Sequence, residues 1–139
     1  MSCHRRLFGL EENCYCAARQ DITESILLSA GGNIVKLHIV TGWMDMLKVA
    51  LWTSRKPSRQ DVLGLLEKIS ALPAELSPVG ANDMDHIHRM LYDYGRLDVF
   101  RKVCRAAKGM AESVIRREKL AVHCHMVIDG GAGIVASSL

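Results

Sequence analysis

The sequence has 139 residues, of which 49% are hydrophobic and 24% are charged. This balance is that of a globular protein, and it excludes a chain that is disordered over most of its length. The formal net charge of +3 permits an anionic ligand but does not call for a nucleic acid.

The cysteine content indicates a reducing compartment. The number of cysteines is odd and their spacing is irregular, which argues against a secreted disulfide framework. They stand at Cys3, Cys14, Cys16, Cys104 and Cys124. The sequence has no apolar run of 18 residues and no signal-peptide pattern, so we expect no membrane span and a cytoplasmic protein.

The chain begins with an irregular lead-in over residues 1–20, and we expect a single domain over residues 21–139. Residues 22–30 contain the apolar run SILLSA, which ends at two glycines and predicts a buried strand. From Asn33 onward, apolar residues recur at helical spacing, although KLHIV at residues 36–40 also alternates like a strand. We favour a helix in two pieces, broken near Gly42.

Three further helices are expected in the middle of the chain. Ser58 and Asp61 have the spacing of a capping box, and the helix that they begin stops at Pro73. A second helix opens at Asp83 and ends at Gly95. The clearest helix covers residues 99–115, where apolar residues recur every three or four positions and basic residues occupy the other face.

The C-terminal part predicts two strands that pair with each other. LAVHCHMVID at residues 120–129 indicates a strand, GGAG a turn, and IVASS at residues 134–138 a second strand that pairs back. The expected fold class is therefore α/β: a small sheet packed with several helices, and a helix-rich C-terminal half that ends in a strand and a hairpin.

The glycines at residues 31–32 are the first candidate site. A strand followed by glycines and a capped helix offers free backbone N–H groups and the positive end of a helix dipole, which together bind anions. The sequence has no phosphate-binding glycine motif, so a plain strand-to-helix turn is the competing interpretation.

Histidines and cysteines form the second candidate. His123 and His125 fall on one face of the expected strand, because side chains alternate along a strand. With Cys14 and Cys16 they offer zinc ligands, but the intervals match no known zinc motif and we predict no metal site. We expect Cys124 to pack inward as a small hydrophobe and the two histidines to be half exposed.

Residues 81–136 resemble the closing segment of the CbiD family, the cobalt-precorrin methyltransferases of anaerobic cobalamin synthesis. The shared order is Ala-Asn, a helix ending at Gly, DVF, a long charged helix, a strand and a Gly turn. Upstream, GGNIVKLHIVTGW at residues 31–43 is similar to the family's glycine-plus-KLVK stretch. Two family features are missing here, namely a Thr-His-Ser segment after KLVK and the N-terminal half.

The resemblance implies a truncated or diverged methyltransferase that transfers a methyl group from S-adenosylmethionine to a corrin-ring carbon. Its substrate would be a tetrapyrrole, with no nucleic acid or membrane as partner. The ligand-binding positions that it carries over are Gly31, Gly32, Asn33, Lys36 and Asn82.

The tail VHCHMVIDGGAGIVASSL also resembles the hairpin of GlcG/HbpS-like small-molecule- or haem-binding modules and of Roadblock-type dimerisation domains. In both, the hairpin is a structural part of the core. The alternative function is therefore a non-catalytic small-molecule-binding or dimerisation module, and seven methionines and two tryptophans suit a homo-oligomer.

Overall fold

The computed structural model describes residues 21–30, 35–69, 91–92, 95–116, 120–127 and 133–138. Their helices and strands alternate along the chain, which confirms the predicted α/β class. The elements are α2 (Ile22–Ser29), β1 (Lys36–Thr41), α3 (Trp43–Leu51), α4 (Arg59–Lys68), α6 (Leu97–Ile115), β2 (Ala121–Val127) and β3 (Ile134–Ser137).

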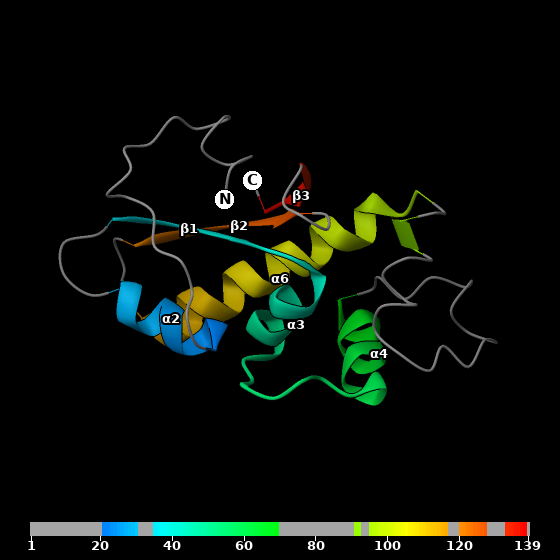
Figure 1. Cartoon of the computed structure of the whole chain (residues 1–139), viewed down its shortest axis with the longest axis horizontal. Coiled ribbons are helices and arrows are strands. Elements are labelled where there is room, and N and C mark those ends of the chain that lie inside the picture. Colours follow the sequence, from blue (N-terminus) through cyan, green and yellow to red (C-terminus); the bar gives the residue numbers. More distant parts are fainter. Residues whose placement is uncertain are drawn as a thin grey trace.

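The three strands form one mixed sheet in the order β1-β2-β3. β1 runs parallel to β2, with Lys36 opposite Ala121 and Thr41 opposite Met126. β3 returns antiparallel to β2, as predicted, with an irregularity in register between Met126 and Val127. Figure 1 shows the strands on one side of the molecule, with α2, α3 and α4 on the other.

The core lies between the sheet and the helices, and α6 is its centre. α6 contacts α3 on one side and β2 and β3 on the other. Its buried residues are Val99, Phe100, Val103, Cys104, Ala107 and Ala111. Phe100 also meets Trp43 of α3 edge to face, with ring centroids 5.5 Å apart. Among the described residues, no helix is both long and apolar enough to cross a membrane.

The predicted strand over residues 22–30 is wrong, because this segment forms α2. Asp21 caps the helix by accepting a hydrogen bond from the backbone N–H of Glu24. Ile26 is buried, whereas Leu27 and Leu28 are 49% and 76% exposed. The strand interpretation counted these two leucines as buried and overlooked the acidic N-cap, which is a helix signal.

The expected helix from Asn33 is also wrong over its first piece, since residues 36–41 form β1. The strand interpretation of KLHIV was the right one, because β1 gains its hydrogen bonds by pairing with β2. The second piece is confirmed as α3, whose N-cap is Gly42 in extended conformation. A strand–glycine–helix unit therefore exists at Gly42, between β1 and α3, whereas residues 31–33 lie outside the described residues.

The remaining described helices confirm the predicted elements, although α4 ends at Lys68, before the expected stop at Pro73. α4 begins after Ser58 with the full capping box, in which Ser58 and Asp61 each accept the other's backbone N–H. Leu91 is helical and buried, and Gly95 follows with a left-handed φ of +68°, consistent with a helix that ends there. The predicted start of that helix at Asp83 lies outside the described residues.

Candidate functional site

The two faces of the sheet have different chemistry. Val122, Cys124 and Met126 of β2 are fully buried in the core with α6. Because side chains alternate along a strand, His123 and His125 belong to the opposite face. The parallel register sets His38 of β1 directly beside His123, so three imidazoles gather on that face.

Short contacts join these imidazoles to each other and to a serine. The ring of His38 lies 5.2 Å, centroid to centroid, from those of both His123 and His125. His38 Nδ1 is 2.9 Å from His125 Nε2, and Ser137 Oγ of β3 is 3.0 Å from His125 Nδ1. We call His38, His123, His125 and Ser137 the histidine cluster; it draws on all three strands.

Burial differs within the histidine cluster. His125 is only 1% exposed, so the expectation that it would be half exposed is wrong, because β1 and β3 flank it on both sides. His123 is partly exposed, as expected, and so are His38 and Ser137. Cys124 packs into the core, which confirms its predicted place.

His123 is held in its neutral form. Burial lowers its pKa, and the positive charges of Lys108 and Lys36 lower it further against an opposing effect of Glu112. Within the described part of the chain, its Nδ1 is buried and has no hydrogen-bond partner. A buried ring nitrogen without a partner costs free energy, so a hydrogen bond formed to this atom would stabilise the folded protein.

Lys36 is the predicted ligand-binding residue that the structure brings to this face. It is exposed at the first position of β1, two residues before His38 and therefore on the same side of the sheet. The other predicted positions, Gly31, Gly32, Asn33 and Asn82, lie outside the described residues. The helix that was expected to begin at Asn33 is replaced by β1, so its N-terminus provides no anion site there.

The described residues offer no metal centre. No group of three or more His, Cys, Asp or Glu side chains among them is arranged to hold a metal ion. Cys14 and Cys16 lie outside the described part of the chain. Burial raises the pKa of Cys104 and of Cys124 to about 12, so both thiols stay protonated at neutral pH.

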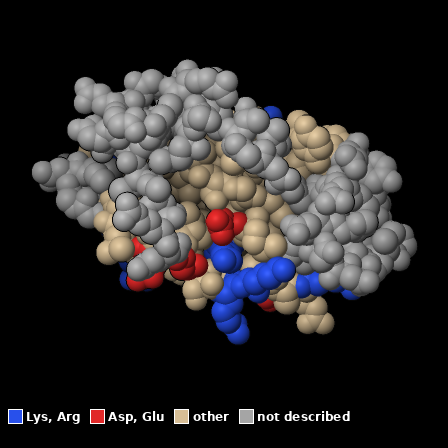
Figure 2. All heavy atoms as spheres, in the orientation of Figure 1, with Lys and Arg blue, Asp and Glu red and all other residues tan. Residues whose placement is uncertain are grey.

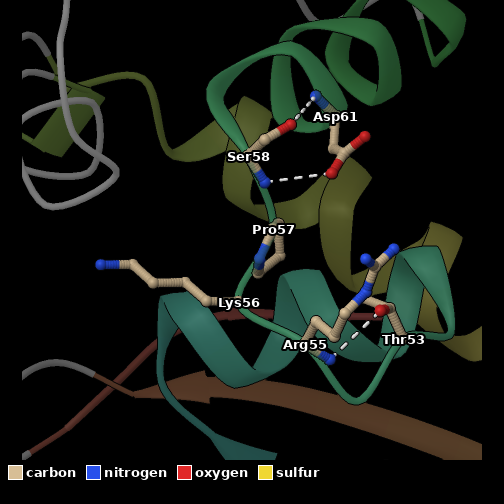
Figure 3. Close-up of a pocket in the computed structure, with 6 residues that line it drawn as sticks. All are labelled: Thr53, Arg55, Lys56, Pro57, Ser58 and Asp61. Carbon is tan, nitrogen blue, oxygen red and sulfur yellow. Dashed lines mark hydrogen bonds between the residues drawn. The ribbon is translucent and has the colours of Figure 1, made fainter.

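A shallow pocket of about 290 Å³ lies where the chain enters α4 (Figure 3). Arg55 and Lys56 supply positive charge, and Figure 2 shows Lys and Arg side chains gathered along the edge of the molecule where α3 connects to α4. However, the N–H groups of Ser58 and Asp61 are taken up by the capping box, and Lys56 points away from the other lining residues. The backbone of the cap therefore offers no free N–H donor to the pocket, and the guanidinium of Arg55 faces a site that also contains the carboxylate of Asp61.

Sequence reasoning found half of the histidine cluster. It placed His123 and His125 on one strand face but assigned His38 to a helix. Only the parallel pairing of β1 with β2, across more than 80 residues of chain, brings His38 to them. The alternation of KLHIV was the available signal, because it puts Lys36 and His38 on the same side.

No protein-family model matches this chain, and neither a curated protein nor a solved structure shows significant similarity to it.

Proposed function

We propose that this protein binds an anionic small molecule on the sheet face that carries Lys36 and the histidine cluster. The observation behind the proposal is the gathering of one ammonium and three imidazoles on a single face. Imidazole N–H groups and the lysine ammonium are donors for carboxylate and phosphate oxygens, and we assign this role to His123 and Lys36, because both ring nitrogens of His125 already contact His38 and Ser137. None of the residues of β1, β2 and β3 is acidic, so the strands present no repelling charge.

Among the described residues, the acidic side chain that acts on His123 is already paired. Glu112 of α6 opposes the lowering of the pKa of His123, but its carboxylate forms an ion pair with Lys108 at 2.8 Å. Lys108 is also anchored, since its ammonium donates to the carbonyl of Val122 at 2.7 Å. This pair leaves Lys36 as the cation on β1 that can accompany an incoming anion.

The resemblance to the CbiD family gives the proposal a specific form. The ligand would be a carboxylate-rich corrin-ring precursor, and the reaction would be methyl transfer from S-adenosylmethionine. Lys36 supports this form because it is both a position matched to the family's KLVK stretch and the cation on the sheet face that carries the histidine cluster. A module that binds the same class of ligand without chemistry is the alternative form.

Thermal unfolding with ligands tests the proposal. We expect S-adenosylmethionine, S-adenosylhomocysteine or a polycarboxylate porphyrin to raise Tm by several degrees, because saturation at 100 times Kd stabilises a protein by about 2.7 kcal/mol. Lys36→Ala should reduce the shift, whereas the control Lys68→Ala at the end of α4 should not. No shift with any of these ligands at millimolar concentration would contradict the proposal.

Methyl transfer and thermal stabilisation together distinguish a methyltransferase from a non-catalytic binding module. Transfer of labelled methyl groups from S-adenosylmethionine to a corrin-ring precursor would support the methyltransferase. An increase in Tm with the tetrapyrrole alone, without methyl transfer, would support the binding module.

A further inference from the structure

We propose that Ser137, His125 and His38 form a nucleophilic centre that hydrolyses small carboxylic esters. This inference does not rest on the proposed function, because it uses the hydrogen-bonded chain in the histidine cluster and not the positive charge of the face. Ser137 Oγ lies 3.0 Å from His125 Nδ1, and His125 Nε2 lies 2.9 Å from His38 Nδ1. A hydroxyl, a base and a group that orients the base are the parts that such chemistry requires.

The proton positions along the hydrogen-bonded series of Ser137, His125 and His38 are coupled. A neutral imidazole carries one N–H, and only one hydrogen fits between His125 Nε2 and His38 Nδ1. When His125 carries that hydrogen on Nε2, its Nδ1 is an acceptor and the Ser137 hydroxyl donates to it. His38, as the acceptor from Nε2, then selects the tautomer of His125 in which Nδ1 carries no proton and can act as a base.

The burial of the three side chains suits these roles. His125, the base, is 1% exposed, so its ring is held between its two partners and is shielded from water. Ser137 is partly exposed on β3, the end strand of the described sheet, so the nucleophile is the more exposed member of the serine–histidine pair. His38 is partly exposed on β1, on the far side of His125 from Ser137.

The reaction proceeds in two balanced steps. Ser137 Oγ attacks the ester carbonyl carbon while its proton moves to His125 Nδ1; the bond to the alcohol oxygen then breaks, and the alcohol leaves with that proton. Water attacks the acyl-serine in the same way, giving its proton to His125 and releasing the acid as Ser137 is regenerated. His38 accepts the Nε2–H of the His125 imidazolium in both steps and acts as a positioning residue.

Covalent labelling of the full chain with a fluorophosphonate tests the assignment, because this reagent traps an activated serine without needing the natural substrate. We expect a stoichiometric adduct on the peptide that contains Ser137, and none on that peptide in Ser137→Ala. His125→Gln should label at least about 100-fold more slowly, in line with the loss of a general base. The control Ser138→Ala removes the adjacent buried serine, which donates or accepts no hydrogen bond with His125 among those described, and should label normally.

The pH profile of the wild-type protein provides a test that needs no folded variant. The labelling rate should rise with pH as His125 loses its proton and then reach a plateau, and His38→Gln should shift the position of that rise. Two results would overturn the inference: labelling of Ser137 no faster than in the protein unfolded by urea, or a rate that climbs through pH 9 without a plateau. Because these readouts involve no anionic ligand, they succeed or fail independently of the thermal-shift experiment.

Discussion

The imidazole rings of His38 and His125 lie nearly parallel, at an interplanar angle of 12°, although the two residues are not partners in the sheet. The register pairs His38 with His123 and Val40 with His125, so this ring contact runs diagonally between the parallel strands. Two imidazolium ions this close would repel each other, so the contact favours at least one neutral ring. The stability of the sheet face is therefore tied to the protonation of its histidines.

The pH dependence of stability provides the first prediction. Burial, Lys108 and Lys36 lower the pKa of His123 below its ordinary value of 6.5, so the unfolded chain binds a proton more readily than the folded protein. The contribution of neutral His123 is full above pH 6.5 and is lost as pH falls below it. We expect the free energy of unfolding, measured with urea, to decrease from pH 7 to pH 5.

The variant His123→Gln isolates this effect, because it keeps a polar side chain and removes the titration. Its unfolding free energy should fall less steeply than that of the wild type between pH 7 and pH 5. The lowered pKa values of Asp21, Asp61 and Asp98 act below about pH 4, outside this window, and His38 and His125 are present in both proteins, so the difference between the two slopes reports on His123. Parallel slopes for the two proteins would show that His123 does not carry the dependence.

Thiol reactivity provides the second prediction. Cys104 and Cys124 are fully buried, and burial raises the pKa of each thiol to about 12. The thiolate is the reactive form, so both should resist iodoacetamide at pH 8 in the folded protein and react fully in urea. Peptide mass spectrometry resolves each site. Rapid native alkylation of Cys124 would mean that the interface between β2 and α6 opens readily.

Local signals in the sequence were enough for several elements. The amphipathic period of α6, the capping box of α4 and the alternation in β2 all come from residues close together in the chain, and each element forms where it was expected. These signals need no knowledge of distant partners, because propensity and burial agree within a single segment.

The errors arose where a distant partner decides the structure. β1 is a strand because it pairs with β2, and nothing within residues 36–41 reveals that partner. α2 exposes Leu28, so its hydrophobicity misleads if every leucine is counted as buried. The histidine cluster shares this difficulty, since His38 joins it only through the parallel pairing.

The capping box of α4 provides the third prediction. Ser58 Oγ accepts the N–H of Asp61, and the carboxylate of Asp61 accepts the N–H of Ser58. Ser58→Ala removes the first of these bonds and should destabilise the protein by about 1 kcal/mol, lowering Tm by a few degrees. The control Ser54→Ala alters an exposed serine in the same connection, outside the cap, and should leave Tm within about one degree. Equal effects of the two substitutions would mean that the cap adds nothing.

Two glycines in different backbone conformations provide the fourth prediction. Gly95 has a φ of +68°, whereas Gly109 lies in the middle of α6, and a Cβ added at either position meets no atom within 4 Å. With steric clashes absent from both sites, only the backbone decides the outcome. Gly95→Ala should destabilise the protein by about 1 kcal/mol, because an L-residue is disfavoured at positive φ.

Gly109→Ala should act in the opposite direction. Alanine is preferred over glycine in a helix interior by about 0.5–1 kcal/mol, and Gly109 is exposed, so the new methyl group disturbs no packing. Urea denaturation of both variants compares the signs directly. A stabilising Gly95→Ala would show that the backbone relaxes out of the left-handed region, and a destabilising Gly109→Ala would show that this face of α6 is covered. If the two substitutions change the free energy of unfolding in opposite directions, backbone conformation is the cause, since neither site gains or loses a contact.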